Sequence, residues 1–203
     1  GRREFFYSVD LVEGAVRRTN RLRCPQREKS LERFAAAPDG SLLAFPGYGG
    51  YVHLVSQRDK QWVADVKMLG SVQTVAFSTD GRFLYSAGGD ARVFVWDLCA
   101  GRRCINSFSD EGAVHTNVLR CAPAGGYQAT GSDSGVVNVY RTADTHSSPS
   151  PEPVGRLLHL TTAVTGVCFN HDSQLLCTYS RSRQDRLRLV HLPSMRAYGN
   201  WPT

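Results

Sequence analysis

Arginine side chains concentrate in two short stretches of this sequence and are its clearest candidates for binding chemistry. A guanidinium group bonds two phosphate oxygens at once, so arginines in exposed loops suit phosphate contact. The net charge of +6 agrees with a polyanionic partner such as nucleic acid. The alternative is a solvated basic surface that pairs with Glu28, Glu32 or Asp185. The candidate contacts to phosphate, RNA or another partner are Arg17, Arg18, Arg21, Arg23, Arg181, Arg183, Arg186 and Arg188.

The sequence contains no motif that clearly predicts a catalytic site. GSDSG at residues 131–135 resembles the surroundings of a serine nucleophile, but that elbow requires a strand-to-helix turn and a triad. The same register position in the preceding copy of the pattern is a turn between two strands, so a hairpin is the better interpretation. The histidines lack the i, i+4 spacing of a metalloprotease, and no glycine-rich nucleotide loop is present. We therefore expect no enzyme and no cofactor.

The cysteines do not predict a metal site. None of the six forms a C-x-x-C pair, and their spacing matches no zinc module. Cys168 and Cys177 fall in apolar runs, where a free thiol behaves as a small hydrophobic side chain. No apolar run approaches the roughly 20 residues that cross a bilayer, so we expect no membrane partner.

The elements that must position these residues repeat along the chain. A strand, a short turn, a second apolar strand, a Gly/Asp/Ser turn and a third strand recur at residues 33–56, 74–97, 118–141 and 166–191, with a partial copy upstream. A period of about 40 to 50 residues with four strands per unit is typical of a WD-repeat β-propeller. We predict an all-β fold that forms an incomplete arc of about four and a half four-stranded blades.

The blades are expected to divide residues 1–203 into consecutive units of one partial propeller. The chain opens in the middle of a blade and stops at NWPT, where another blade would begin, so we expect a segment of a larger propeller. The predicted blades are residues 4–23 (partial), 30–69, 70–111, 112–160 and 161–203.

One segment departs from the pattern, and one copy keeps it best. Residues 142–154 are rich in Ser and Pro, and we expect a long exposed loop there, between the third and fourth strands of a blade. Its Ser148-Pro149 and Ser150-Pro151 pairs are open to phosphorylation, although a tolerated insertion explains them as well. The residues expected to hold blades together are Ser86, Asp90, Trp96, Asp97 and Asp133, the last through its own turn.

More specific runs carry a family resemblance. They include FFYSVDLVEG (5–14), DARVFVWDL (90–98), GSDSGVVNVY (131–140), LTTAVTGVCFNHDSQLL (160–176) and RLVHLPS (188–194). In these runs the chain resembles the U3 small nucleolar RNA-associated protein 18 family, WD-repeat components of the small-subunit processome. The loops AAPDGS, LRCAPAGGY and TYSRSRQDR depart from the family's pattern.

The resemblance implies a function and a location. It implies a nucleolar, hence nuclear, scaffold that supports processing of pre-18S ribosomal RNA without catalysing it. The implied partners are other WD-repeat subunits of the processome and the U3 small nucleolar ribonucleoprotein, with direct contact to pre-ribosomal RNA left open. The alternative is a WD-repeat adaptor of another complex, such as a substrate receptor of a ubiquitin ligase.

Overall fold

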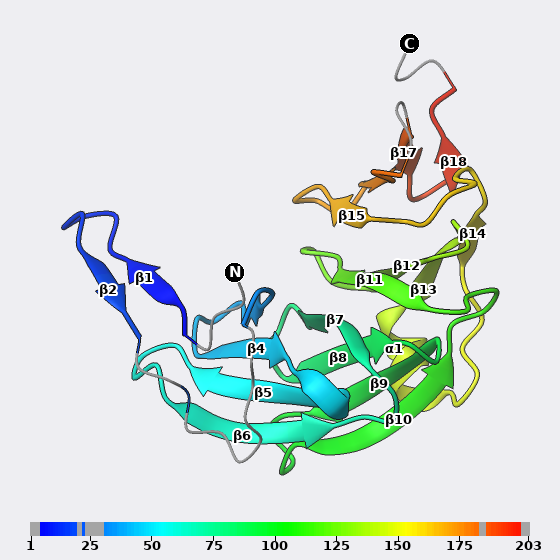
Figure 1. The fold of residues 1–203 in the computed structure, drawn as a ribbon. Coiled ribbons are helices and arrows are strands. Elements are labelled where there is room, and N and C mark those ends of the chain that lie inside the picture. Colours follow the sequence, from blue (N-terminus) through cyan, green and yellow to red (C-terminus); the bar gives the residue numbers. More distant parts are fainter. Residues whose placement is uncertain (1–4, 20–21, 23–30, 183–185, 200–203) are drawn as a thin grey trace.

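Four antiparallel sheets of four strands each follow one another along the chain in an open arc (Figure 1). The structure is a computed structural model that describes residues 5–19, 22, 31–182 and 186–199. Within each sheet the strands are neighbours in chain order, which is the arrangement of a propeller blade. A two-stranded hairpin precedes the first sheet. The prediction of an all-β, incomplete propeller arc is therefore confirmed, although one short helix is present.

The strands have the following bounds. The hairpin consists of β1 (Tyr7–Val9) and β2 (Val16–Arg18). The first two sheets consist of β3 (Ala35–Ala36), β4 (Leu42–Pro46), β5 (Tyr51–Ser56) and β6 (Trp62–Lys67), and of β7 (Val72–Phe77), β8 (Phe83–Gly88), β9 (Arg92–Asp97) and β10 (Arg103–Ser109). The last two consist of β11 (Thr116–Cys121), β12 (Tyr127–Ser132), β13 (Val137–Arg141) and β14 (Gly155–Leu157), and of β15 (Gly166–Phe169), β16 (Leu175–Tyr179), β17 (Leu187–His191) and β18 (Arg196–Ala197). The assignment of these sheets to one domain stays a prediction.

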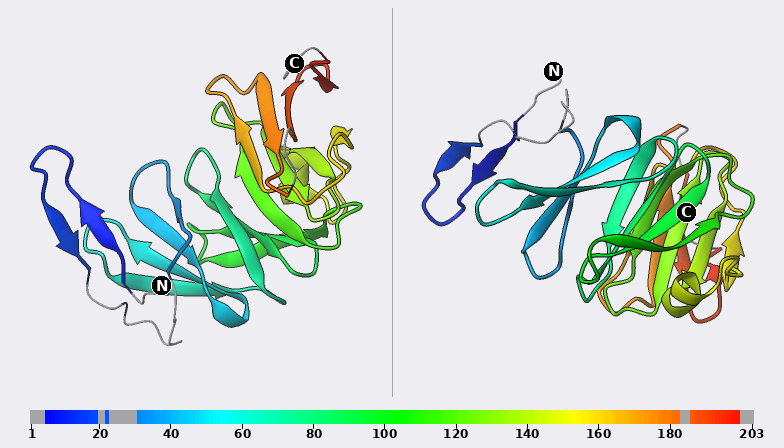
Figure 2. Two further views of the ribbon diagram at one scale, coloured as in Figure 1. Left: turned by 45° about the horizontal axis from the view of Figure 1, so that its top comes forward. Right: turned by 90° about the horizontal axis from the view of Figure 1, so that it is seen from below.

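The first strand of a sheet lies on the inner side of the arc, and the last strand lies on the outer side (Figures 1 and 2). Neighbouring sheets meet along their inner strands. The backbone N–H of Leu119 on β11 donates a 3.2 Å hydrogen bond to Oγ1 of Thr74 on β7. Residues on β7, β11 and β15 therefore face one shared space at the inside of the arc.

Apolar side chains fill the space between neighbouring sheets. Leu84 and Tyr85 are adjacent on β8, and both are fully buried. Leu84 packs with Leu54 in the core between the first two sheets, whereas Tyr85 packs with Leu119 in the next core. Successive side chains of a strand point to opposite faces, so a central strand that is buried on both faces reads as a continuous apolar run. This explains runs such as FLYS in the sequence.

The first turn of each sheet has a repeated backbone conformation. Gly40, Gly81 and Gly125 have φ values of 69°, 71° and 79°, and Ser173 takes the same position with φ 59°. These are the PDG, TDG, AGG and HDS turns that the sequence predicts. A left-handed residue is needed at this point of each reversal, which is why glycine recurs there.

The expected long loop at residues 142–154 is partly wrong. Helix α1 (Thr142–Ser147) occupies its first half, and Thr145 within it is fully buried. Nδ2 of Asn106 on β10 donates to the carbonyl oxygens of Thr145 and Ser148, at 2.7 and 2.6 Å. The segment is therefore docked against the preceding sheet, and its Ser/Pro composition does not show this contact. Within the described residues, no helix is long and apolar enough to cross a membrane.

The residues expected to hold the blades make specific contacts. Nε1 of Trp96 donates to Oγ of Ser86 at 2.9 Å, and both side chains are buried. Asp90 accepts a 3.3 Å bond from the backbone of Arg92 within its own turn. Asp133 behaves differently from expectation, because it accepts a 3.1 Å bond from the backbone N–H of His115 in the loop before β11. That contact joins two loops of one sheet rather than fixing a single turn.

Candidate functional site

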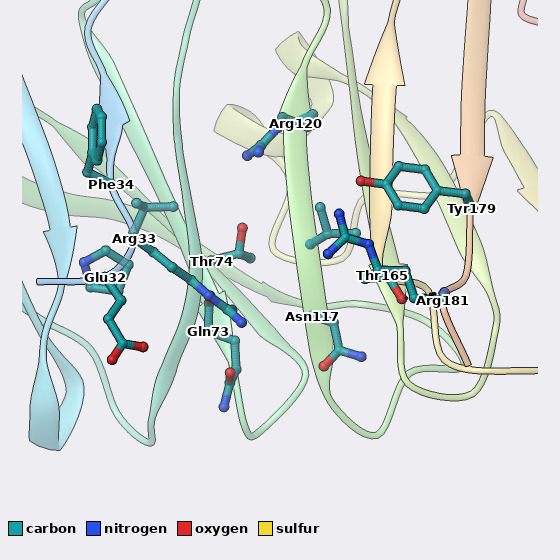
Figure 3. A pocket seen from close by; sticks show the side chains of 13 residues that line it. Glu32, Arg33, Phe34, Gln73, Thr74, Asn117, Arg120, Thr165, Tyr179 and Arg181 are labelled. Atoms are coloured by element: carbon teal, nitrogen blue, oxygen red, sulfur yellow. Dashed lines mark hydrogen bonds between the residues drawn. The ribbon is translucent and has the colours of Figure 1, made fainter. Parts of the chain in front are cut away.

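A cavity of about 410 Å³ lies on the inner side of the arc (Figure 3). Its volume falls within the range of small-molecule binding pockets. Residues from β7, β11 and β16, and from the segments just before β3 and after β16, line it, so all four sheets contribute to one site. The polar lining residues are Glu32, Arg33, Gln73, Thr74, Asn117, Arg120, Thr165, Tyr179 and Arg181.

Three arginines give the cavity its charge. Arg33, Arg120 and Arg181 are exposed, and each comes from a different sheet or its flanking segment. Nη1 of Arg33 donates to the carbonyl oxygen of Gln73 at 3.4 Å, and Nη1 of Arg120 donates to the carbonyl of Leu119 at 3.1 Å. None of the three forms a salt bridge with a carboxylate among the described residues. Among the described residues that line the cavity, Glu32 alone carries an opposing charge.

Tyr179 supplies an aromatic wall, and a glycine makes room for it. Tyr179 on β16 pairs with Gly166 on β15. A Cβ atom at Gly166 would lie 2.2 Å from Cζ of the Tyr179 ring, so any other residue there would displace the ring. The missing side chain allows the ring to lie across the neighbouring strand and face the cavity (Figure 3).

The backbone near Arg181 is also fixed. Its N–H donates to Oγ1 of Thr165 at 3.0 Å, and its guanidinium carbon lies 6.0 Å from the centre of the Tyr179 ring. A second ring, Phe34, lines the other side of the cavity and is 62% exposed. Guanidinium groups, aromatic rings and amide side chains thus surround one space. This combination suits a ligand that carries both anionic groups and flat rings.

The first predicted arginine cluster lies away from the cavity. Arg17 and Arg18 are exposed on β2, at the end of the arc opposite β17 (Figure 1). Nη2 of Arg17 lies 3.7 Å from the Glu13 carboxylate, and the guanidinium of Arg18 lies 3.8 Å from the centre of the Phe5 ring. Arg21 and Arg23 lie outside the described residues.

The second predicted cluster is divided. Arg181 lines the cavity, whereas Arg186 and Arg188 lie just before and on β17, where both are half-buried. Nη1 of Arg188 donates to the carbonyl of Leu187 at 2.9 Å. Arg183 lies outside the described residues. Among the described members of the two clusters, Arg181 alone lines the cavity, and Arg17 and Arg18 lie away from it.

Sequence reasoning missed Arg33 and Arg120 because these residues do not occupy equivalent positions of the repeat. Arg33 precedes the first strand of its sheet, and Arg120 lies within the first strand. Arg181 follows the second strand of the last sheet. The three arginines come together only because the sheets are arranged around a common inner side. Of the three, Arg120 alone lies on an inner strand.

The other polar clusters have structural roles. Oδ1 of Asp65 accepts 2.6 Å bonds from Nε1 of Trp62 and from the ring of His53, which is fully buried. Ser132 and Ser134 of the GSDSG segment bond each other in the β12–β13 hairpin, as the hairpin interpretation predicts. In the part of the chain that the structure describes, no group of three His, Cys, Asp or Glu residues is placed to hold a metal ion.

Comparison with known proteins shows which proteins this chain is similar to. The pattern described as "WD domain, G-beta repeat" matches residues 66–97, the end of the first sheet and most of the second. The U3 small nucleolar RNA-associated protein 18 homolog of Arabidopsis thaliana is 38% identical over 202 residues, which are 100% of this chain and 36% of that protein. Along its whole length the chain is similar to proteins named U3 small nucleolar RNA-associated protein 18 homolog. The U3 small nucleolar RNA-associated protein 18 homolog of Homo sapiens is 34% identical over 97% of this chain and 35% of its own length.

The match to these U3-associated homologues covers nearly all of this chain but only part of each homologue. The chain spans about a third of the length of both relatives. Among solved structures, a chain in the crystal structure of the mitotic checkpoint complex superposes with a TM-score of 0.79 and 15% identity. That match covers 96% of this chain and 56% of the other, and it supports the propeller fold alone.

Proposed function

We propose that this chain is part of a non-enzymatic scaffold in ribosome biogenesis, which supports nucleolar processing of pre-18S ribosomal RNA within the U3 small nucleolar ribonucleoprotein and small-subunit processome. The carrying observation is the similarity along the whole chain to proteins named for their association with U3 small nucleolar RNA. The proposed location is the nucleus and, within it, the nucleolus. The proposed partners are other WD-repeat subunits, the ribonucleoprotein and pre-ribosomal RNA.

Exposed apolar side chains on the loops support a role in assembly. Tyr48, Leu69 and Val114 are 87%, 72% and 63% exposed. Tyr48 lies in the β4–β5 connection, and the other two lie in the loops that lead into β7 and β11. These connections share one edge of the sheets, because in each sheet the second strand ends where the first strand begins. Exposed apolar groups on a rigid scaffold are typical of protein-binding surfaces.

The polar clusters support a binding role rather than catalysis. The buried His53–Asp65 pair is engaged with Trp62, and the hydroxyl of Ser132 accepts a bond from the backbone of Val136 in its own hairpin. A catalytic triad requires a nucleophile within hydrogen-bond reach of its base. Neither cluster combines a nucleophile with a base in this way.

The alternative adaptor of a ubiquitin ligase is not favoured by the relatives, which share the name of a U3-associated protein across plants, animals and fungi. The two functions differ in what they co-purify. The proposed scaffold brings down U3 small nucleolar RNA and processome proteins, whereas the adaptor brings down ligase subunits. Recovery of ligase subunits without U3 RNA would favour the adaptor.

Depletion of the natural full-length protein tests the proposal in cells. We expect unprocessed pre-ribosomal RNA to accumulate and small subunits to be lost, as measured by northern blotting and sucrose gradients. Normal processing after depletion would contradict the proposed function. Rescue with Tyr48, Leu69 and Val114 replaced by Glu should fail if this surface docks partners. Replacement of Ile105 and Leu158, which are 43% and 64% exposed elsewhere, provides the matched control.

A further inference from the structure

We propose that the inner cavity binds single-stranded RNA, with Arg33, Arg120 and Arg181 contacting backbone phosphates and Tyr179 stacking on a base. The inference deepens the proposed function, on which it rests for the presence of RNA near the protein. It assigns RNA contact to a site that includes Arg181 alone of the described arginines expected from the sequence.

The net positive charge of the cavity lining favours the binding of an anion. Arg33, Arg120 and Arg181 contribute three positive charges to one lining, and Glu32 contributes one negative charge. Since no described carboxylate forms a salt bridge with these arginines, their donors remain available beyond the backbone bonds of Arg33 and Arg120. Like charges that line a concave surface focus a positive field there, which attracts a phosphate chain.

Several sheets contribute these charges, which matches an extended ligand. Arg33 precedes β3, Arg120 lies on β11 and Arg181 follows β16. In Figure 3 the three side chains extend from different parts of the arc toward the space between them. A single small anion would need them to converge on one point. A phosphate backbone that passes across the inner strands meets them in succession instead.

The aromatic residues favour RNA. Single-stranded nucleic acid sites combine a basic groove with rings on which bases stack. Gly166 leaves space for the Tyr179 ring, so its position is set by the fold before a ligand arrives. Phe34, with 62% of its surface exposed, offers a second ring on the opposite side. An acidic peptide would use the arginines but would not require ring faces beside them.

The amide and hydroxyl side chains fit the same ligand. Gln73 and Asn117 line the cavity beside the arginines, and each lies at a register shift in the pairing of its strand. Amide groups bond base edges and the ribose 2′-hydroxyl, which carries a donor and an acceptor. The cavity therefore combines phosphate contacts, a stacking surface and polar groups for the sugar and base.

Binding of a fluorescent 15-nucleotide oligouridine to the full-length natural protein tests the proposal. We compare wild type with a triple variant, Arg33→Gln, Arg120→Gln and Arg181→Gln. The affinity should fall at least about tenfold at physiological salt. The slope of log affinity against log salt should become shallower by about 2, because each phosphate contact on a single strand contributes about 0.7.

A control triple removes the same charge elsewhere. Arg58, Arg103 and Arg141 are exposed and do not line the cavity. Their replacement by Gln should change the affinity and the salt slope much less than the cavity triple. Thermal melts confirm that both variants are folded. Equal losses in the two triples would indicate binding to nonspecific charge, and no loss in either would show that these arginines do not contact the RNA. Either result would overturn the cavity proposal.

The stacking step has its own test. Tyr179→Ala should weaken oligouridine binding by about 5- to 150-fold, while Tyr179→Phe should retain it, because the ring face carries the interaction. An unchanged affinity of the alanine variant would overturn the stacking role. A 15-residue polyglutamate tests the rival occupant. If polyglutamate binding depends on the cavity arginines and oligouridine binding does not, the RNA proposal is wrong.

Co-purification separates the two levels of inference. Wild-type protein that recovers U3 RNA from cells but fails to bind oligouridine through the cavity would overturn the cavity site alone. Protein that binds oligouridine through the cavity but recovers no U3 RNA would overturn the proposed function. Each result therefore identifies which of the two inferences fails.

Discussion

The hydroxyl of Tyr140 donates a 2.9 Å hydrogen bond to Oδ1 of Asp110, although the two residues lie on β13 and in the loop before β11. Asp110 is buried, with 3% of its surface exposed. Its carboxylate also accepts bonds from the side chains of Thr116, Thr130 and Asn138, at 3.0, 2.8 and 2.8 Å. One carboxylate in the connection between two sheets thus gathers donors from three strands of the later sheet.

Replacement of Asp110 should destabilise the protein strongly. Asp110→Ala leaves several buried donors without an acceptor, so we expect the free energy of unfolding to fall by about 3 kcal/mol or more. Tyr140→Phe removes one bond to a charged group and should cost about 1.5 to 3 kcal/mol. Urea denaturation measures both. Asp59→Ala on the exposed β5–β6 turn is the control and should cost less than about 0.5 kcal/mol. An Asp110 variant as stable as this control would contradict the structural role.

Gly88 is required by the close approach of another loop. A Cβ atom at this position would lie 1.8 Å from the carbonyl oxygen of Ser71, a backbone atom that cannot rotate away. We expect Gly88→Ala to lower stability by about 1 to 3 kcal/mol, because the loop into β7 must shift. Gly199→Ala is the control, since no atom of the described residues lies within 4 Å of a Cβ there. Equal melting temperatures for the two variants would show that the loop yields without cost.

The docking of α1 should depend on pH through His146. Its Nε2 lies 2.6 Å from the hydroxyl of Tyr85, and its ring packs 4.2 Å from the centre of the Phe83 ring. Burial lowers the pKa of His146, and the positive charge of Arg82 lowers it further, while Asp80 and Asp97 oppose the shift. The folded protein thus favours the neutral ring. Its contribution is present above the unfolded pKa of about 6.5 and is lost as the pH falls below it.

Hydrogen exchange measures this dependence. Protection factors for the α1 amides should fall between about pH 7 and pH 5, because the charged ring is disfavoured in its docked position. His146→Gln should remove the dependence, and His159→Gln, at an exposed position, should retain it. Equal protection at both pH values in the wild type would show that His146 does not control docking.

The sequence repeat made it possible to predict the blades, whereas the contacts between repeats could not be predicted. Turns such as PDG at 38–40 recur in register because every blade must reverse in the same way. Asp110 lies in FSDEGAV, which reads as an ordinary connection. Its partners lie 6 to 30 residues away, and no local pattern shows that they converge.

The candidate site shows the same limit. Arg181 was found because arginines cluster in its neighbourhood, but Arg33 and Arg120 are isolated in the sequence. They meet Arg181 only where the inner strands of different sheets line one cavity. Helix α1 was not predicted for a different reason. The Ser/Pro-rich composition of this segment is typical of an exposed loop and gives no sign that Thr145 is buried. The local sequence pattern thus predicts the strands. The arrangement of the sheets in space determines which exposed side chains share a site.

The Asp97 of the Trp-Asp pair joins two parts of its sheet. Its Oδ2 accepts bonds from Nε and Nη2 of Arg82 at 3.2 and 2.8 Å. Its Oδ1 accepts bonds from the backbone N–H groups of Cys99 and Ala100 at 2.9 and 3.0 Å. The side-chain bond to Arg82 and the backbone bond to Ala100 lower the pKa of Asp97.

These contacts predict a ranking of variants and a pH dependence. Asp97→Ala should lower the melting temperature more than Arg82→Gln, because it removes the backbone bonds as well as the ion pair. Asp97→Asn keeps an acceptor and should fall between them. Since the folded pKa of Asp97 is depressed, its stabilisation is present above the unfolded pKa of about 3.9 and is lost as the pH falls through the folded value. The melting curves of wild type and Asp97→Ala should therefore converge between about pH 5 and pH 2, and a constant gap would show that the charge of Asp97 does not stabilise the sheet.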